Sequence, residues 1–241
     1  MQTAIIPERL ARLPDITLKS GNSAENEARM CVMEAVAYVA GEPWSDHPKC
    51  ACPVITAFMV SWNDGLPSDA ERNRLLAPLI PRLVGTRNKA LEERRSLMAA
   101  DWLVREHTPA WLRLAGLTTQ ADALTNLPEI TSMAQVPSIR GPLEAARKDA
   151  DAAGDAARAA AWDAAWAAAG DAARAAAGDA ARAAAGDAAW DAAWAAAWDA
   201  ARAAAWAAVW DAARDALAET TATLQQSALR LVERMIAAEP A

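Results

Sequence analysis

Phenylalanine and tyrosine are almost absent from this sequence, which holds one Phe and one Tyr beside 11 Trp. Positive charge is also in short supply, since 24 Lys and Arg stand against 31 Asp and Glu and the formal net charge is -7. Binding to the phosphates of a nucleic acid needs clustered Lys and Arg. The charge balance therefore argues against a broad nucleic-acid-binding surface.

Cysteine and long apolar runs are equally scarce. The three Cys are an odd number, which argues against a secreted disulfide scaffold and favours a reducing, cytoplasmic compartment. The opening residues MQTAIIPERLARLPD lack the apolar core of a signal peptide. No run of about 18 uncharged apolar residues occurs, so the sequence predicts no membrane span.

Proline is missing between Pro142 and Pro240. Within this stretch, residues 151–218 repeat a tetrapeptide of the form (Asp or Ala)-Ala-Ala-(Arg, Trp or Gly). Because Ala is the best helix former, the repeat predicts a very long α-helix, which would bend most easily at its glycines. These glycines are Gly154, Gly170, Gly178 and Gly186. A straight helix from Pro142 to Glu239 would be on the order of 145 Å long.

Most of the tryptophan lies in this repeat. Seven Trp occupy its fourth position, and all fall within roughly 200° of an ideal helical wheel. They are Trp162, Trp166, Trp190, Trp194, Trp198, Trp206 and Trp210. A packed Trp buries about 150–250 Å², which a lone helix in water cannot provide. We therefore expect this aromatic side to pack on the N-terminal domain, to fold back on itself, or to join another copy. The alternative is an expanded DNA repeat whose product is tolerated without a function.

The predicted fold class is all-α. It comprises a compact helical domain over 1–140, the Ala-rich repeat helix over 141–218 and an amphipathic helical end over 219–241. In that end, Leu217, Leu224, Leu231 and Met235 recur at heptad-like spacing. This spacing is typical of a helix that packs on a core or in a bundle.

Helix start and stop signals divide the first domain. Asn22 and Glu25 predict a capping box for a helix over 23–40 that ends at Gly41. Further signals predict a helix from Pro53 to Trp62, a start at Ser68, short turns at Pro78 and Pro81, helices over 89–107 and 108–116, and one that ends before Pro128. In the helix over 89–107, the run Glu92, Glu93, Arg94 and Arg95 is typical of an ordinary charged helix face, with a partner site as the alternative. No alternating pattern predicts a strand.

Four stretches of this domain resemble a known group of proteins. They are LPDITLKSG, CVMEAVAYVAGEPWSDHPKCACPVI, RLVGTRNKALEERR and ADWLVREHTPAWLRLAGL. Together with the Ala/Trp/Asp/Arg repeat, they resemble uncharacterised proteins of actinobacteria and their phages. The resemblance covers most of the chain and implies a cytoplasmic, bacterial or phage setting. It implies no mechanism.

One group of residues has the chemistry of a metal site. Cys31, His47, Cys50 and Cys52 lie within a short stretch, and Zn²⁺ is held by four thiolate and imidazole ligands in tetrahedral geometry. The spacing of His47 and Cys50 suits a zinc knuckle, so a structural zinc is one interpretation. The other is that Cys31 is a small buried core residue, as free Cys often is, and that His47 lies in a loop.

The same residues raise the question of an enzyme. A nucleophilic Cys31 or Cys50 would need His47 as its base, oriented by Asp46 or Glu34. The sequence contains no known local motif of a cysteine hydrolase, no Gly-rich phosphate loop and no dinucleotide fingerprint. We therefore expect a protein that is not an enzyme.

The favoured function is protein–protein interaction or self-assembly through the Trp-lined, Ala-rich helix, with a homo-oligomer or another protein as partner. One alternative is an acidic decoy or inhibitor in phage–host conflict, because residues 151–215 hold ten Asp and five Arg and rows of Asp can imitate a phosphate backbone. The other is a small zinc-binding protein or enzyme that uses Cys31, His47, Cys50 and Cys52.

Overall fold

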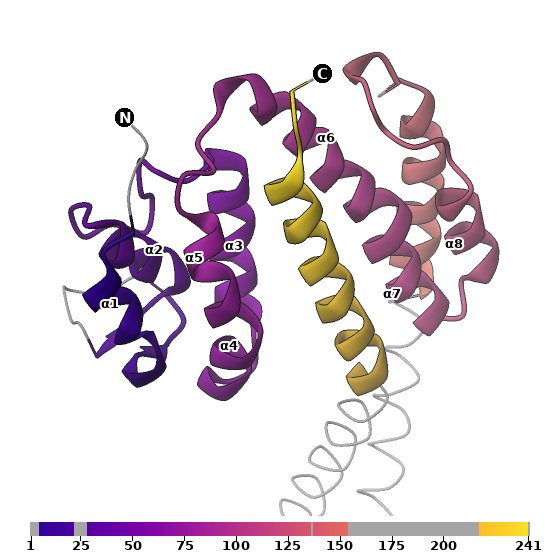
Figure 1. Cartoon of the computed structure of the whole chain (residues 1–241). Helices are drawn as coiled ribbons and strands as arrows, with labels where there is room; N and C mark the ends of the chain where they lie inside the picture. The colour runs from indigo at the N-terminus through magenta and orange to yellow at the C-terminus, as the bar shows by residue number, and fades with distance from the viewer. Residues whose placement is uncertain (1–4, 22–27, 136, 154–216, 241) are drawn as a thin grey trace, which may run out of the picture. The chain divides into compact units, whose positions relative to one another are not determined.

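The computed structural model describes residues 5–21, 28–135, 137–153 and 217–240. These residues are predominantly helical (Figure 1), so the all-α prediction is confirmed for this part of the chain. Most of the predicted repeat helix, including all seven of its Trp, lies outside the described residues. The chain divides into two units, and each is described by itself. Unit 1 comprises Met1–Glu106, Pro128–Pro137 and Gln225–Ala241, and unit 2 comprises His107–Leu127 and Ser138–Leu224.

Unit 1 begins with short elements around a two-stranded parallel ladder. They are α1 (Pro7–Ala11), the 3₁₀ turn η1 (Leu13–Asp15), β1 (Thr17–Leu18) and β2 (Arg29–Met30). Thr17 is opposite Arg29 in the ladder. The predicted helix start near residue 23 is wrong, because Arg29 and Met30 are extended. The strands are two residues long, which is too short to give an alternating pattern.

Helix α2 (Val32–Ala40) is the central element of unit 1, and every one of its residues is buried. It ends at Gly41 as predicted, in the left-handed conformation with φ 71°. A Cβ atom at this position would lie 2.6 Å from Cδ1 of Ile6. Gly41 therefore provides both the positive φ and the space that brings α1 against α2.

The next helices of unit 1 begin where the sequence signals place them. Helix α3 (Pro53–Gly65) opens on proline, and α4 (Asp69–Leu76) has Ser68 as its N-cap, whose hydroxyl accepts from the Glu71 amide. Prolines confine the following segment to short pieces, η2 (Ala77–Leu79) and α5 (Ile80–Leu83). The predicted long helix is observed as η3 (Lys89–Leu91), α6 (Glu92–Trp102) and a π-helical turn, η4 (Leu103–His107).

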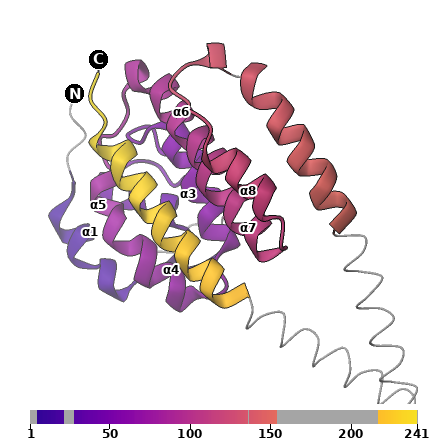
Figure 2. The same cartoon turned by 90° about the vertical axis from the view of Figure 1, so that its right-hand side faces the viewer.

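The C-terminal helix comprises residues 217–237, and its part from residue 225 onward completes the core of unit 1. It lies between α5 and α6 in Figure 1, and the view turned by 90° shows it along α5 (Figure 2). Leu231, Val232 and Met235 are each 0% exposed. Of the residues at heptad-like spacing, Leu231 and Met235 are thus part of a core with residues of α2, α3 and α5, whereas Leu217 is 38% exposed.

Unit 2 has a small apolar core of its own. Helices α7 (Thr108–Leu114) and α8 (Thr118–Thr125) are joined through Gly116, which has φ 77°. The helical residues 138–153 pack on them, and the core consists of Leu112, Ala121, Leu124 and Ala146. Leu143 and Ala150 pack against this core. The helix that leads into the repeat is therefore anchored by apolar contacts.

Candidate functional site

Cys31 is the N-cap of α2, and its thiol belongs to a capping box. The Cys31 Sγ accepts a hydrogen bond from the Glu34 amide at 3.4 Å, and Glu34 Oε2 accepts from the Cys31 amide at 2.7 Å. The other carboxylate oxygen of Glu34 accepts from the indole N–H of Trp44 at 3.2 Å. The buried carboxylate thus joins the N-terminus of α2 to the following loop. Cys31 therefore has a structural role as the cap of α2, which the spacing of the Cys and His residues does not indicate.

The surroundings of the thiols oppose ionisation. Burial, with the nearby Glu34 carboxylate, raises the pKa of Cys31 from 9.0 to about 12. Burial, with Glu42, raises the pKa of Cys50 to about 11. Since the thiolate is the form that attacks and that binds metals, both groups are held in the unreactive state at neutral pH.

The structure does not gather the four predicted zinc ligands into a metal site. Cys31, Cys50 and Cys52 are buried and unpaired with one another, whereas the His47 side chain is 69% exposed. The His47 ring contacts its neighbour, with Nδ1 2.8 Å from Asp46 Oδ1. Within the described ranges, no three His, Cys, Asp or Glu side chains lie where they could hold a metal ion. The structural zinc and the zinc enzyme stay predictions.

A pocket of ≈ 240 Å³ lies beside the Cys31 end of α2. Its lining comprises Gly21, Cys31, Asp46, Val60, Asn63 and Asp64. The polar groups here are used within the fold, because Asp64 Oδ1 accepts from the Gly21 amide at 2.7 Å and from Asn63 Nδ2 at 2.9 Å. The pocket is thus lined by one thiol and two carboxylates, and burial raises the pKa of that thiol.

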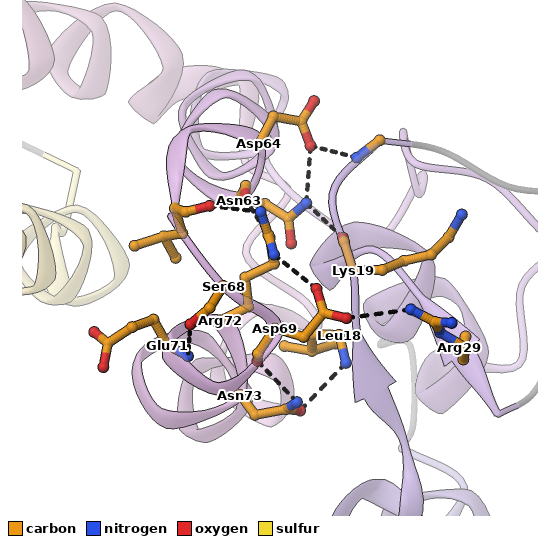
Figure 3. Close-up of polar contacts among 12 residues, drawn as sticks. Leu18, Lys19, Arg29, Asn63, Asp64, Ser68, Asp69, Glu71, Arg72 and Asn73 are labelled. Atoms are coloured by element: carbon orange, nitrogen blue, oxygen red, sulfur yellow. Dashed lines mark hydrogen bonds and ion pairs between the residues drawn. The ribbon is translucent and has the colours of Figure 1, made fainter. Parts of the chain in front are cut away.

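Asn63 is the centre of a larger polar network beside this pocket (Figure 3). Its amide side chain accepts from the Val32 amide at 3.3 Å and donates to the Lys19 carbonyl at 2.9 Å. Asn63 therefore joins the start of α2 and the chain after β1 to α3. Because a fully buried amide is costly unless it is hydrogen-bonded, this network specifies one arrangement of the three segments.

Arg72 closes the same network from α4 (Figure 3). Its guanidinium donates to the Asn63 carbonyl at 2.7 Å, to the Leu66 carbonyl at 2.6 Å and to Asp69 at 2.7 Å. Asp69 also accepts from Arg29 of β2 at 3.2 Å. Asp69 thus links α4 to β2 through its contacts with Arg72 and Arg29.

A second polar network holds the C-terminal helix in unit 1. The guanidinium of Arg95 is buried, 2% exposed, and donates to the Met235 carbonyl at 2.8 Å and to the Thr86 carbonyl at 2.7 Å. The prediction that Arg95 is part of an ordinary charged helix face is wrong. An arginine can be buried when its N–H groups donate to backbone carbonyls. The Met235 carbonyl lies too far along the chain for a local sequence pattern to indicate this contact.

The middle of this helix is held through the hydroxyl of Ser227. Trp102 Nε1 donates to Ser227 Oγ at 2.7 Å, and the Ser227 hydroxyl is hydrogen-bonded to the Glu106 carboxylate. Arg82 of α5 forms an ion pair with Glu233 at 2.8 Å. Arg82, Arg95 and Trp102 are thus polar contacts of α5 and α6 with the C-terminal helix.

The comparisons with known proteins add no relative. No family model, curated protein or solved structure matches the chain. In the part of the chain that the structure describes, no helix is long and apolar enough to cross a membrane. The resemblance to actinobacterial and phage proteins stays a prediction, and the function is inferred from the residues of this chain.

Proposed function

We propose that this protein is a non-enzymatic interaction protein that self-assembles through its Trp-lined, Ala-rich repeat. The observation that carries the proposal is the anchoring of the repeat at both ends. The helix before it packs through Leu143, Ala146 and Ala150 in unit 2, and the helix after it buries Leu231 and Met235 in unit 1. The repeat is thus bounded in the sequence on both sides by helices that pack in apolar cores.

The chemistry of the described residues supports a binding protein over an enzyme. The thiols of Cys31 and Cys50 have raised pKa values, and the buried polar side chains Glu34, Asn63 and Arg72 are committed to backbone partners. A catalytic site usually requires a group whose pKa is tuned towards reactivity. These networks instead stabilise unit 1, which also contains the helix that follows the repeat.

The proposal is tested by truncating part of the aromatic side. Replacing Trp190, Trp194 and Trp198 by Ala retains helix propensity and removes three large apolar side chains. The expected result is an assembly midpoint at least about tenfold higher in protein concentration, because one tenfold step corresponds to about 1.4 kcal/mol and buried Trp contacts exceed that value. Sedimentation velocity over a concentration series measures the midpoint.

The matched control replaces the same three Trp by Leu. Leu keeps an apolar side chain at each position and is also a good helix former, so this variant is expected to retain most of the assembly. An Ala variant that assembles as readily as the unchanged chain would overturn the role of the aromatic side. Circular dichroism of both variants checks that the helical content is retained.

A further inference from the structure

We propose that the pocket beside the Cys31 end of α2 binds a small organic cation, an ammonium group on a short alkyl chain. The pocket has a volume of ≈ 240 Å³, and all of its lining residues belong to unit 1. An engineered protein cavity of about 150 Å³ holds a benzene molecule, so this pocket has room for a ligand of that size. The binding site is independent of the proposed self-assembly.

The lining of the pocket is negatively charged. Asp46 and Asp64 contribute two carboxylates, and none of the lining residues is Lys, Arg or His. The third titratable group is Cys31, whose thiol stays neutral because burial raises its pKa to about 12. Two carboxylates in a partly enclosed pocket attract cations and repel anions. The ligand is therefore positively charged.

Each carboxylate has an oxygen available for a ligand. Asp64 uses Oδ1 to accept from the Gly21 amide and from Asn63 Nδ2. Its second oxygen has no hydrogen-bond partner among the described residues, and Figure 3 shows it directed away from the network. Asp46 likewise uses only Oδ1, which lies 2.8 Å from Nδ1 of His47. Carboxylate oxygens are strong acceptors for the N–H groups of an ammonium.

The helix end at the pocket does not favour an anion. Three amides in its first turn already have acceptors within the fold, and these pairs are Cys31 with Glu34 Oε2, Val32 with Asn63 Oδ1, and Glu34 with Cys31 Sγ. The buried Glu34 carboxylate also opposes the positive end of the helix dipole. An anion would need free N–H groups at this helix end, and these amides are not free.

The lining favours an organic cation over a metal ion. Mg²⁺ and Ca²⁺ take six or more oxygen ligands, whereas no three His, Cys, Asp or Glu side chains in the described ranges could hold a metal ion together. Val60 adds an apolar wall to the pocket, and burial of an alkyl chain against it stabilises the complex. A ligand with both an ammonium and an alkyl chain uses both parts of the lining.

The test titrates the full chain with pentylammonium by isothermal titration calorimetry, with pentan-1-ol as the neutral analogue of equal chain length. Pentylammonium is expected to bind with a Kd below about 1 mM. Pentan-1-ol is expected to bind at least about tenfold more weakly, because it lacks the charge-assisted hydrogen bonds to the carboxylates. A Kd above about 1 mM for pentylammonium, or equal binding of the two probes, would overturn the proposal.

Substitutions of the carboxylates locate the site. Asp64→Asn and Asp46→Asn each keep an oxygen acceptor for the bonds within the fold and remove one charge, so each is expected to weaken pentylammonium binding at least about tenfold. The matched control is Glu93→Gln, which makes the same change of charge at an exposed residue outside the lining. Equal losses in all three variants would show non-specific attraction and overturn the proposal.

Val60→Phe tests the location without a change of charge. The larger side chain occupies part of the pocket, so pentylammonium binding is expected to be lost, while circular dichroism checks that the variant is folded. A folded Val60→Phe variant that retains the affinity would overturn the assignment to this pocket.

Free alkylamines and lysine side chains share the chemistry of this ligand. Nα-acetyl-lysine amide, titrated in the same way, distinguishes the two sources. Tighter binding of this compound than of pentylammonium supports a lysine side chain of another protein as the ligand, and weaker binding supports a free amine. Failure of both compounds to bind would overturn the proposal.

Discussion

At the scale of single residues, the interior of unit 1 contains several polar side chains that are hydrogen-bonded mainly to backbone groups. Glu34 is an example, because its two carboxylate oxygens accept from the Cys31 amide and the Trp44 indole. Asn63 accepts from the Val32 amide and donates to the Lys19 carbonyl, and Arg72 donates to the Asn63 carbonyl. Buried polar groups with complete partner sets favour one packing arrangement over others, and these residues are therefore expected to be intolerant of substitution.

Thr56 departs from this pattern and gives a prediction. It is buried in α3, and its hydroxyl has no hydrogen-bond partner within the described residues. Thr56→Val removes the unsatisfied hydroxyl at nearly constant volume, so the free energy of unfolding is expected to rise by about 1 kcal/mol. Urea unfolding followed by circular dichroism measures the change.

The control for this prediction is a threonine whose hydroxyl is satisfied. Thr86 Oγ1 accepts from the Cys52 amide at 3.0 Å and donates to the Leu83 carbonyl at 2.8 Å. Thr86→Val is expected to lower the free energy of unfolding by about 1–3 kcal/mol, because it leaves a buried amide without its acceptor. Equal effects of the two substitutions would contradict this account.

A second prediction concerns the pH dependence of stability. The pKa of Cys31 is raised from 9.0 to about 12 by burial and by Glu34. The folded state therefore keeps a proton that the unfolded state loses above about pH 9, so the stability from this group is complete below that pH and is lost as pH rises towards 12. Cys31→Ser keeps an N-cap acceptor and removes the titration.

The expected result is a smaller loss of stability for Cys31→Ser than for the unchanged chain between pH 9 and 11, with both proteins folded at pH 7. Other alkaline groups titrate equally in the two proteins and cancel in the comparison. Urea unfolding at a series of pH values measures the two slopes, and parallel slopes would mean that the Cys31 thiol does not resist ionisation.

At the scale of secondary-structure elements, the C-terminal helix is the piece that completes unit 1. Its apolar face enters the core with residues of α2, α3 and α5, while Arg95 and Trp102 of α6 bind it at two points. A helix so far along the chain from its partners contributes contacts of high sequence separation. Unit 1 is therefore expected to lose stability whenever this helix is weakened.

Leu231 tests that expectation. Its side chain is 0% exposed, and Leu231→Ala removes apolar contacts and leaves a cavity. The free energy of unfolding is expected to fall by about 2–5 kcal/mol. Leu217→Ala is the control on the same helix, because Leu217 is 38% exposed and its truncation should change stability by less than about 0.5 kcal/mol. Thermal unfolding measures the melting temperatures of both variants. Equal decreases for Leu231→Ala and Leu217→Ala would contradict this expectation.

The elements that local signals specify are those that the sequence predicts. Proline and serine caps mark α3 and α4, and Gly41 and Gly116 mark helix ends, because each acts through its own backbone conformation. The start of α2 is missed because its N-cap is a cysteine, a residue outside the usual capping set. The two-residue strands have no periodicity to detect.

The polar contacts of the candidate sites could not be predicted in the same way. In the sequence, Arg95 has the pattern of a charged helix face. It is buried because it donates to the carbonyl of Met235 in the C-terminal helix, 140 residues further along the chain. The grouping of Cys31, His47, Cys50 and Cys52 suggests a metal site because the four are close in sequence. Closeness in sequence says little about whether side chains point to one centre, and here three are buried while His47 is exposed.

At the scale of the whole molecule, an acidic, Ala-rich repeat lies in the sequence between two helices that pack in apolar cores. The helix that precedes the repeat is anchored in unit 2, and the helix that follows it is anchored in unit 1. The repeat carries seven of the 11 Trp in the chain, which is more aromatic surface than a lone helix in water can bury. Under the proposed function, association between copies would provide that burial.

The most direct test of self-assembly is the mass of the full chain in solution. Size-exclusion chromatography with multi-angle light scattering, run over a range of protein concentrations, compares that mass with the 25.5 kDa of one copy. We predict masses at multiples of 25.5 kDa that increase with concentration. A single species of 25.5 kDa at every concentration would contradict the proposal that the repeat joins copies of this chain.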